Sequence, residues 1–150
     1  MYRLMLYFLL ILLFTSIIES GLGILPYRAG DIFLTSAILV SVSWITNKAF
    51  AKILKAAANP ESTLITALIL ALIVGPLNPL SNIAFLIAAS VFATAAKYIL
   101  AIRKRHIFNP AAIGVWLTAL LIQRGASWWV GSAEMLLFVA GGGFLILAKI

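Results

Sequence analysis

Long apolar runs, divided by short polar or glycine- and proline-containing stretches, make up most of the chain. The runs predict six helical segments at about residues 4–25, 31–50, 60–75, 80–105, 110–123 and 132–149. Asn59-Pro60 and Asn109-Pro110 predict two of the helix starts. Asn accepts hydrogen bonds from first-turn amides, and Pro is tolerated at the first helical position because its missing N–H is not needed there. Asp31 is expected to cap the second helix.

The third and fifth segments are shorter than a membrane crossing requires. The third has ~16 residues and the fifth ~14, which correspond to ~24 Å and ~21 Å against a hydrocarbon core of ~30 Å. We interpret both as broken membrane helices, which need protein or a cavity around their ends. The Gly141-Gly142-Gly143 run of the last segment favours close helix packing over a hinge.

The composition predicts an all-α integral membrane protein. Hydrophobic residues make up 64% of the sequence and charged residues 10%. Six crossings would use nearly all 150 residues, so we expect one membrane domain over residues 1–150. The first run is interpreted as a retained helix rather than a signal peptide, because no small-residue cleavage site follows it. Trp44, Trp128 and Trp129 are expected to form part of the interfacial aromatic belt.

The basic residues predict the orientation. Counted by alternate loops, two lie on one side, Arg28 and Arg124, and nine lie on the other: Arg3, Lys48, Lys52, Lys55, Lys97, Arg103, Lys104, Arg105 and Lys149. This bias predicts a multi-pass protein of the cell (inner) membrane with both ends of the chain cytoplasmic. The basic clusters carry no interleaved aromatic residues, so we expect no nucleic acid partner.

Several kinds of chemistry have no candidates in the sequence. The absence of cysteine excludes iron–sulfur clusters ligated by cysteines of this chain, and a single histidine excludes a haem held by two imidazoles. A haem with His and Met ligands would need His106 to meet Met1, Met5 or Met135, so we predict no haem. No metal-ligand spacing or Ser/His/Asp set is present. The four acidic residues, Glu19, Asp31, Glu61 and Glu134, fall at predicted segment ends, so no buried carboxylate for proton or sodium transfer is expected.

The predicted topology suggests an anion-binding pocket. Segments three and five would both begin at the cytoplasmic side, with free amides beside Lys55, Arg103 and Arg105. Ser62, Thr63 and Thr66 lie on the first turns of segment three, within reach of such a ligand. Two simpler interpretations remain open: each Asn-Pro pair only caps its helix, and Lys97 anchors the end of helix four at the membrane interface.

The stretches STLITALILALIVGPL and KYILAIRKRHIFNPAAIG carry a family resemblance. They resemble a membrane subunit of the Rnf electron-transport complex and its homologue in the sodium-pumping NADH:quinone reductase, with the same order of segments from about residue 35 to 150. Urea transporters are a more distant likeness. By position, Thr66, Lys97, Asn109 and Pro110 match the family pattern, and we add Thr63 on geometry, as candidate cofactor-binding residues.

The resemblance implies a bundle of two inverted five-helix repeats. This chain would supply the first repeat, residues 1–125, and the opening helix of the second, residues 126–150. The rest of the bundle would come from a missing second half or an oligomeric copy. The loop QRGASWWVGSAE lacks the family's attachment motif for covalent flavin. We therefore expect a flavin that is non-covalent or carried by a partner, and a reductase domain or subunit as a partner.

Our main hypothesis is a membrane component of a flavin-dependent electron-transfer system. It would pass electrons between a cytoplasmic donor and a membrane flavin or quinone, and its own status as an oxidoreductase is left open. The first alternative is a small-solute channel or transporter of urea-transporter-like architecture. The second is a membrane scaffold without a ligand of its own.

Overall fold

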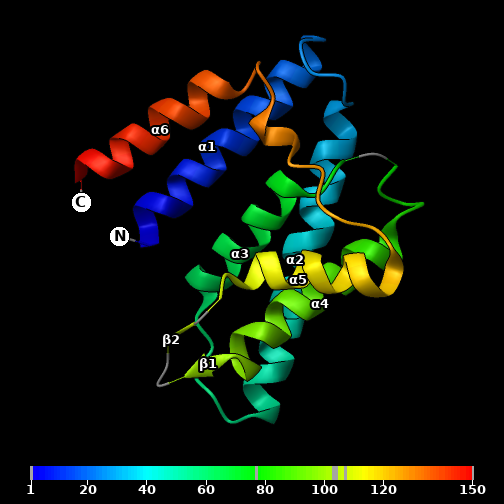
Figure 1. The fold of residues 1–150 in the computed structure, drawn as a ribbon, viewed down its shortest axis with the longest axis vertical. Helices are drawn as coiled ribbons and strands as arrows, with labels where there is room; N and C mark the ends of the chain where they lie inside the picture. The colour runs from blue at the N-terminus through cyan, green and yellow to red at the C-terminus, as the bar shows by residue number, and fades with distance from the viewer. Residues whose placement is uncertain (1, 77, 103–104, 107, 150) are drawn as a thin grey trace.

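The computed structural model describes residues 2–76, 78–102, 105–106 and 108–149. Over these residues the fold is all-helical, as predicted, with six α-helices (Figure 1): α1 (Tyr2–Gly21), α2 (Ala29–Ile53), α3 (Pro60–Ile73), α4 (Ile83–Ile99), α5 (Pro110–Ile122) and α6 (Leu136–Lys149). A short 3₁₀ helix, η1 (Trp129–Gly131), precedes α6. By length and composition, α1 and α2 could each cross a membrane, whereas the other four are shorter.

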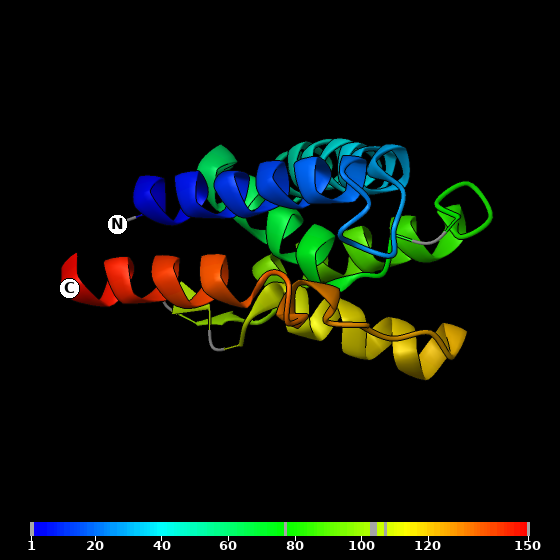
Figure 2. The same cartoon turned by 90° about the horizontal axis from the view of Figure 1, so that it is seen from above.

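The prediction that the fourth helix extends to residue 105 is wrong. Helix α4 ends at Ile99, and two short antiparallel strands follow, β1 (Ala101–Ile102) and β2 (Arg105–His106). The physical reason is the packing of the next helix: α5 returns along α4 in the opposite direction, so the connection has to reverse (Figures 1 and 2).

Two other predicted boundaries also change. The residue that precedes α2 is Arg28, without a side-chain cap, and Asp31 lies inside the first turn, so Asp31 is not the cap. Helix α6 begins at Leu136 rather than near residue 132, because η1 and a turn occupy the intervening residues. As a result four helices, and not only the two predicted, have fewer than 18 residues.

Helix α3 is the centre of the fold. Nine of its fourteen residues are buried, and α1, α2, α4, α5 and η1 all pack against it. Figure 2 shows α1 and α2 along one side and α5 and α6 along the opposite side; α3 and α4 lie between α2 and α5, while α6 faces α1 directly. Leu70 and Val74 at the end of α3 belong to one core cluster, while Leu68 and Leu72 belong to a second. A helix that is apolar on every face is expected to be enclosed in this way.

The C-terminal end of α3 is covered by the segment before α6. The carbonyl of Ile73 accepts hydrogen bonds from the backbone N–H groups of Ser127 (2.9 Å) and Trp128 (3.1 Å). The indole Nε1 of Trp129 donates to the carbonyl of Ala71 at 3.0 Å. Carbonyls in the last turn of a helix have no partner within the helix, so these bonds satisfy them.

The assignment of Trp129 to an interfacial belt is therefore wrong. Its side chain is 4% exposed and serves as a cap on α3, whereas Trp128 is 64% exposed. The ring of Tyr27 packs edge-on against Trp129, with the ring centres 5.6 Å apart. The sequence does not distinguish these two neighbouring tryptophans. Their exposure differs because the side chain of Trp129 contacts the end of α3.

Small residues form the contact between α4 and α5. A Cβ atom added to Gly114 would lie 2.7 Å from the carbonyl oxygen of Ala89 and 2.8 Å from the Cβ of Ala93. The two backbones thus approach as closely as glycine and alanine allow. Small residues at helix contacts are typical of packing that does not depend on burying large side chains.

Helix α6 lies along α1 at the edge of the fold (Figures 1 and 2). The helix is continuous through its three glycines, and the ring of Phe8 occupies the space where Gly142 would carry a Cβ atom. Close packing is therefore the role of at least Gly142. None of the residues of α6 is buried, although most are apolar.

We predict that Gly114→Ala destabilises the protein by about 1–3 kcal/mol, because the added methyl group meets backbone atoms that cannot move aside. Gly141→Ala is the matched control, since Gly141 is also helical and nothing lies within 4 Å of its added Cβ atom. Thermal unfolding in detergent, followed by circular dichroism, measures both. Equal unfolding midpoints for the two variants would contradict the close approach of α4 and α5.

We also predict that Trp129→Phe lowers the free energy of unfolding by about 1–3 kcal/mol, because the buried carbonyl of Ala71 loses its donor. The control is Trp128→Phe, which changes the exposed neighbour and should shift stability by less than about 0.5 kcal/mol. The same unfolding measurement applies. A larger effect at Trp128 than at Trp129 would count against the cap on α3.

Candidate functional site

Contacts between helices bring several helix ends to one end of the fold. Nε of Arg3 donates to Oε1 of Glu61 at 3.2 Å, which joins the start of α1 to the start of α3. The end of α4 also lies there, because the Lys97 ammonium contacts Thr63 in the first turns of α3. Both chain ends lie at the same side in Figures 1 and 2.

Helices α2 and α4 run parallel in a fixed register. Oγ of Ser90 donates to the carbonyl of Leu39 at 3.5 Å, and the hydroxyl of Tyr98 donates to Oδ1 of Asn47 at 2.8 Å. In both pairs the partners are 51 residues apart, so the two helices advance together over this stretch. The rings of Phe50 and Tyr98 stack with their centres 5.9 Å apart and extend the contact to the end of α2.

Lys97 is a buried cation without a carboxylate partner. Its side chain is 7% exposed, and Nζ donates to Oγ1 of Thr63 at 3.4 Å. All four acidic residues of the chain lie in the described part, and the ion pair found there is Arg3 with Glu61. The lysine therefore points into the fold rather than outward, and no carboxylate of the described chain neutralises it.

Other buried polar side chains lie at the same level as Lys97. Ser43 is midway between Leu39 and Asn47 on α2, so the register places it opposite Thr94 of α4. We define the Lys97 cluster as the six buried polar residues of this region: Ser43, Asn47, Thr63, Thr66, Thr94 and Lys97. Three helices contribute to it, and each of its members is at most 7% exposed.

The hydroxyl groups of the cluster differ in whether they already have a hydrogen-bond partner. Those of Thr63, Thr66 and Thr94 donate to backbone carbonyls four residues earlier, at 2.8–2.9 Å. Oγ of Ser43 is buried and has no partner among the described residues. Lys97 therefore has N–H groups that are not directed at Thr63, and Ser43 has a free O–H group. Both can donate to a ligand that accepts hydrogen bonds.

The two Asn-Pro pairs cap their helices as predicted. Oδ1 of Asn59 accepts from the backbone N–H of Ser62 at 3.1 Å, and Oδ1 of Asn109 accepts from that of Ala111 at 3.0 Å. These caps use amides that the predicted anion pocket would have drawn on. Hence Lys97, rather than a set of free amides, is the main positive group of this site.

The predicted site residues are only partly brought together. Thr63 touches Lys97, and Thr66 lies one turn further along α3. Asn109 is exposed and Pro110 half-buried at the start of α5, and no described contact joins them to Thr63 or Lys97. Their part in a shared site stays a prediction.

Only some of the basic residues predicted beside the pocket belong to the described part of the chain. Lys55 is exposed in the turn after α2. Arg103 and Lys104 lie outside the described residues, and only the backbone of Arg105 and His106 is described. The contribution of these arginines to the site therefore stays a prediction.

Comparisons with known proteins add no relative. No family model, curated protein or solved structure matches the chain. The resemblance drawn from the sequence therefore stays a prediction.

Sequence reasoning missed Ser43, Asn47 and Thr94. A signal was present, because Ser43 and Asn47 on α2, like Ser90 and Thr94 on α4, are polar residues four apart within apolar segments. Residues four apart share a helix face. The parallel register that sets these two faces against each other could not be read from the spacing.

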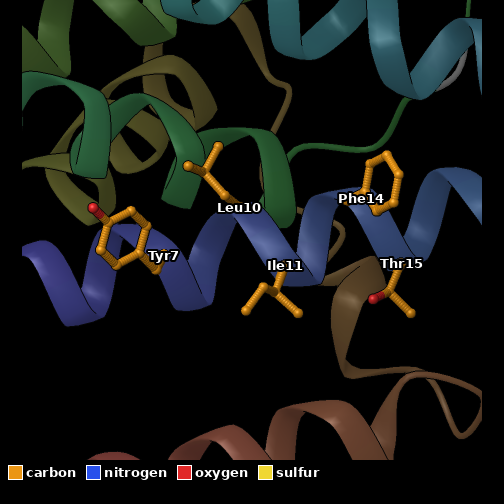
Figure 3. Close-up of a pocket in the computed structure, with 5 residues that line it drawn as sticks. All are labelled: Tyr7, Leu10, Ile11, Phe14 and Thr15. Atoms are coloured by element: carbon orange, nitrogen blue, oxygen red, sulfur yellow. The ribbon is translucent and has the colours of Figure 1, made fainter.

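An open groove of about 530 Å³ lies on the outer face of α1 (Figure 3). Its lining is almost entirely apolar and comes from one helix: Tyr7, Leu10, Ile11, Phe14 and Thr15. No member of the Lys97 cluster lines it. This groove lacks the donors that a polar ligand needs, so the Lys97 cluster is the better candidate site.

Proposed function

We propose that the chain is a multi-pass membrane protein. The distribution of side chains supports this: large apolar residues such as Ile11, Phe14 and Phe144 are 59–72% exposed, while buried positions of α2 and α4 carry Ser, Thr, Asn and Lys. In water such an exterior would be costly, whereas in lipid the apolar residues face the solvent they prefer. The short helices then need the cover that neighbouring helices give α3.

The charge distribution supports the predicted orientation. Arg3, Lys52 and Lys97 belong to the helix ends near the start of α3, whereas Arg28 and Arg124 belong to the opposite ends of α2 and α5. The positive-inside rule assigns the first group to the cytoplasm, so both chain ends would be cytoplasmic at the inner membrane. The exposed face of α6 fits a missing second half of the bundle or an oligomeric copy.

Because the chain has no cysteine, single-cysteine variants test this topology directly. We expect a membrane-impermeant maleimide to label Arg124→Cys in intact cells or right-side-out vesicles, and Lys52→Cys only after the membrane is opened. Both positions are exposed, so accessibility depends on the side of the membrane. Labelling of both variants from the same side would refute the orientation.

Within this membrane protein, we infer a component of a flavin-dependent electron-transfer system, of the Rnf or NADH:quinone reductase kind. The observation that carries the proposal is the buried Lys97 ammonium on Thr63, which fits the phosphate or ribityl end of a flavin. Lys97 would hold that end, with Ser43, Thr63 and Thr66 around it. A bound flavin would supply one- or two-electron transfer. The reductase that delivers electrons would be a partner domain or subunit.

A second function has its own supporting observation. Oγ1 of Thr35 and Oγ of Ser43 lie on one side of α2, and both are buried without a partner in the described part of the chain. Unpartnered hydroxyls inside a helix bundle also suit a path for a small polar solute, as in a channel of urea-transporter-like architecture. The purely scaffolding alternative gives no role to these groups or to Lys97.

Measurements of absorption, electron transfer and solute conduction on the purified protein distinguish these functions. We expect it to carry a flavin absorption band and to support reductase-coupled electron transfer, with both lost or strongly reduced in Thr66→Val and Lys97→Met. Thr15→Val, in the groove on α1, is the matched control and should keep both. Colourless protein that conducts a small solute in liposomes would favour the channel. Colourless protein with neither activity would leave only the scaffold.

A further inference from the structure

We propose that the Lys97 cluster binds a phosphate-type oxyanion. This inference rests on the proposed function, because it names the chemical group that the same site would hold. The oxyanion could be inorganic phosphate or the phosphate of a mononucleotide, and the two sources share the chemistry that the cluster recognises.

The buried charge of Lys97 requires compensation. Burial of an ammonium group is costly unless an anion neutralises it. The chain does not supply that anion: Glu61 is held by Arg3 at 3.2 Å, Glu19 and Asp31 belong to the opposite ends of α1 and α2, and Glu134 lies in the turn before α6. A bound anion would supply that compensation.

Hydrogen-bond donors of the cluster come from different directions. Lys97 on α4 has N–H groups left over, and the buried hydroxyl of Ser43 on α2 has no partner among the described residues. A tetrahedral oxyanion has several acceptor oxygens and can receive charge-assisted hydrogen bonds from donors on different helices.

The surface near the cluster is basic. Lys48 and Lys55 are exposed at the same end of the fold, near the end of α2. Exposed cations raise the local concentration of anions around them. An anion would thus approach the buried Lys97 ammonium from a basic surface.

The test uses the full chain purified in detergent and titrated with inorganic phosphate, with binding followed by calorimetry and by the rise in unfolding temperature. We expect saturable binding to the wild type. Binding should weaken about tenfold to a hundredfold in Lys97→Met, because a charge-assisted hydrogen bond is lost, and up to about tenfold in Ser43→Ala. Lys149→Met, which changes an exposed lysine of α6, should bind like the wild type.

Lys97→Met is expected to fold, because replacing an uncompensated buried charge by an apolar side chain of similar length is often neutral or stabilising. Ser43→Ala is a second, milder variant of the same site. The inference is overturned if the wild type shows no saturable phosphate binding, or if Lys97→Met binds phosphate as tightly as the wild type does.

Competition identifies the source of the oxyanion. Displacement of phosphate by flavin mononucleotide, but not by riboflavin, would support a nucleotide phosphate at Lys97. Phosphate binding that depends on Lys97 and resists both flavins would support free phosphate as the ligand, and would count against the flavin function alone. Displacement by riboflavin as effective as that by flavin mononucleotide would overturn recognition through the phosphate.

Discussion

A helix of fourteen residues is only about 21 Å long, whereas the hydrocarbon core of a bilayer is about 30 Å thick, and in the membrane setting that we propose this mismatch would govern the architecture around α3. With the predicted orientation, α3 begins at the exposed cytoplasmic side and its other end would stop short of water, so protein must satisfy the backbone groups of that end. At one end Asn59 caps the first turn, and at the other Trp129 and the backbone of Ser127 and Trp128 take up the last carbonyls. The flanking helices then enclose its sides.

The interior formed in this way is more polar than the exterior. Ser43, Thr94 and Lys97 lie between helices, while aromatic and aliphatic side chains cover the outside. Most of the buried hydroxyls are satisfied by carbonyls of their own helix, so they cost little and need no outside partner. Lys97 and Ser43 are different, because Lys97 has no carboxylate partner and Ser43 has no hydrogen-bond partner among the described residues, and our proposal of a bound ligand starts from these two groups.

Local features of the fold were predictable from the sequence, while features set by packing were not. The starts of α3 and α5 agree with the prediction because an Asn-Pro cap involves only neighbouring residues. The end of α4 was predicted too late, because the reversal into α5 depends on a contact between helices. Of the candidate site, Thr63 and Lys97 are two predicted residues that the fold does bring into contact. Ser43 was missed because α2 is apolar on its exposed face as well, so no amphipathic pattern marked the buried one.

The adjacent positions of Lys97 and Tyr98 have a mechanical consequence. Neighbouring residues on a helix point about 100° apart, so one turns toward Thr63 of α3 and the other toward Asn47 of α2. A roll of α4 about its long axis would disturb both contacts, because they are made to different helices. A molecule that draws the ammonium away from Thr63 can do so by bending the lysine chain alone, while Tyr98 keeps the helix from following.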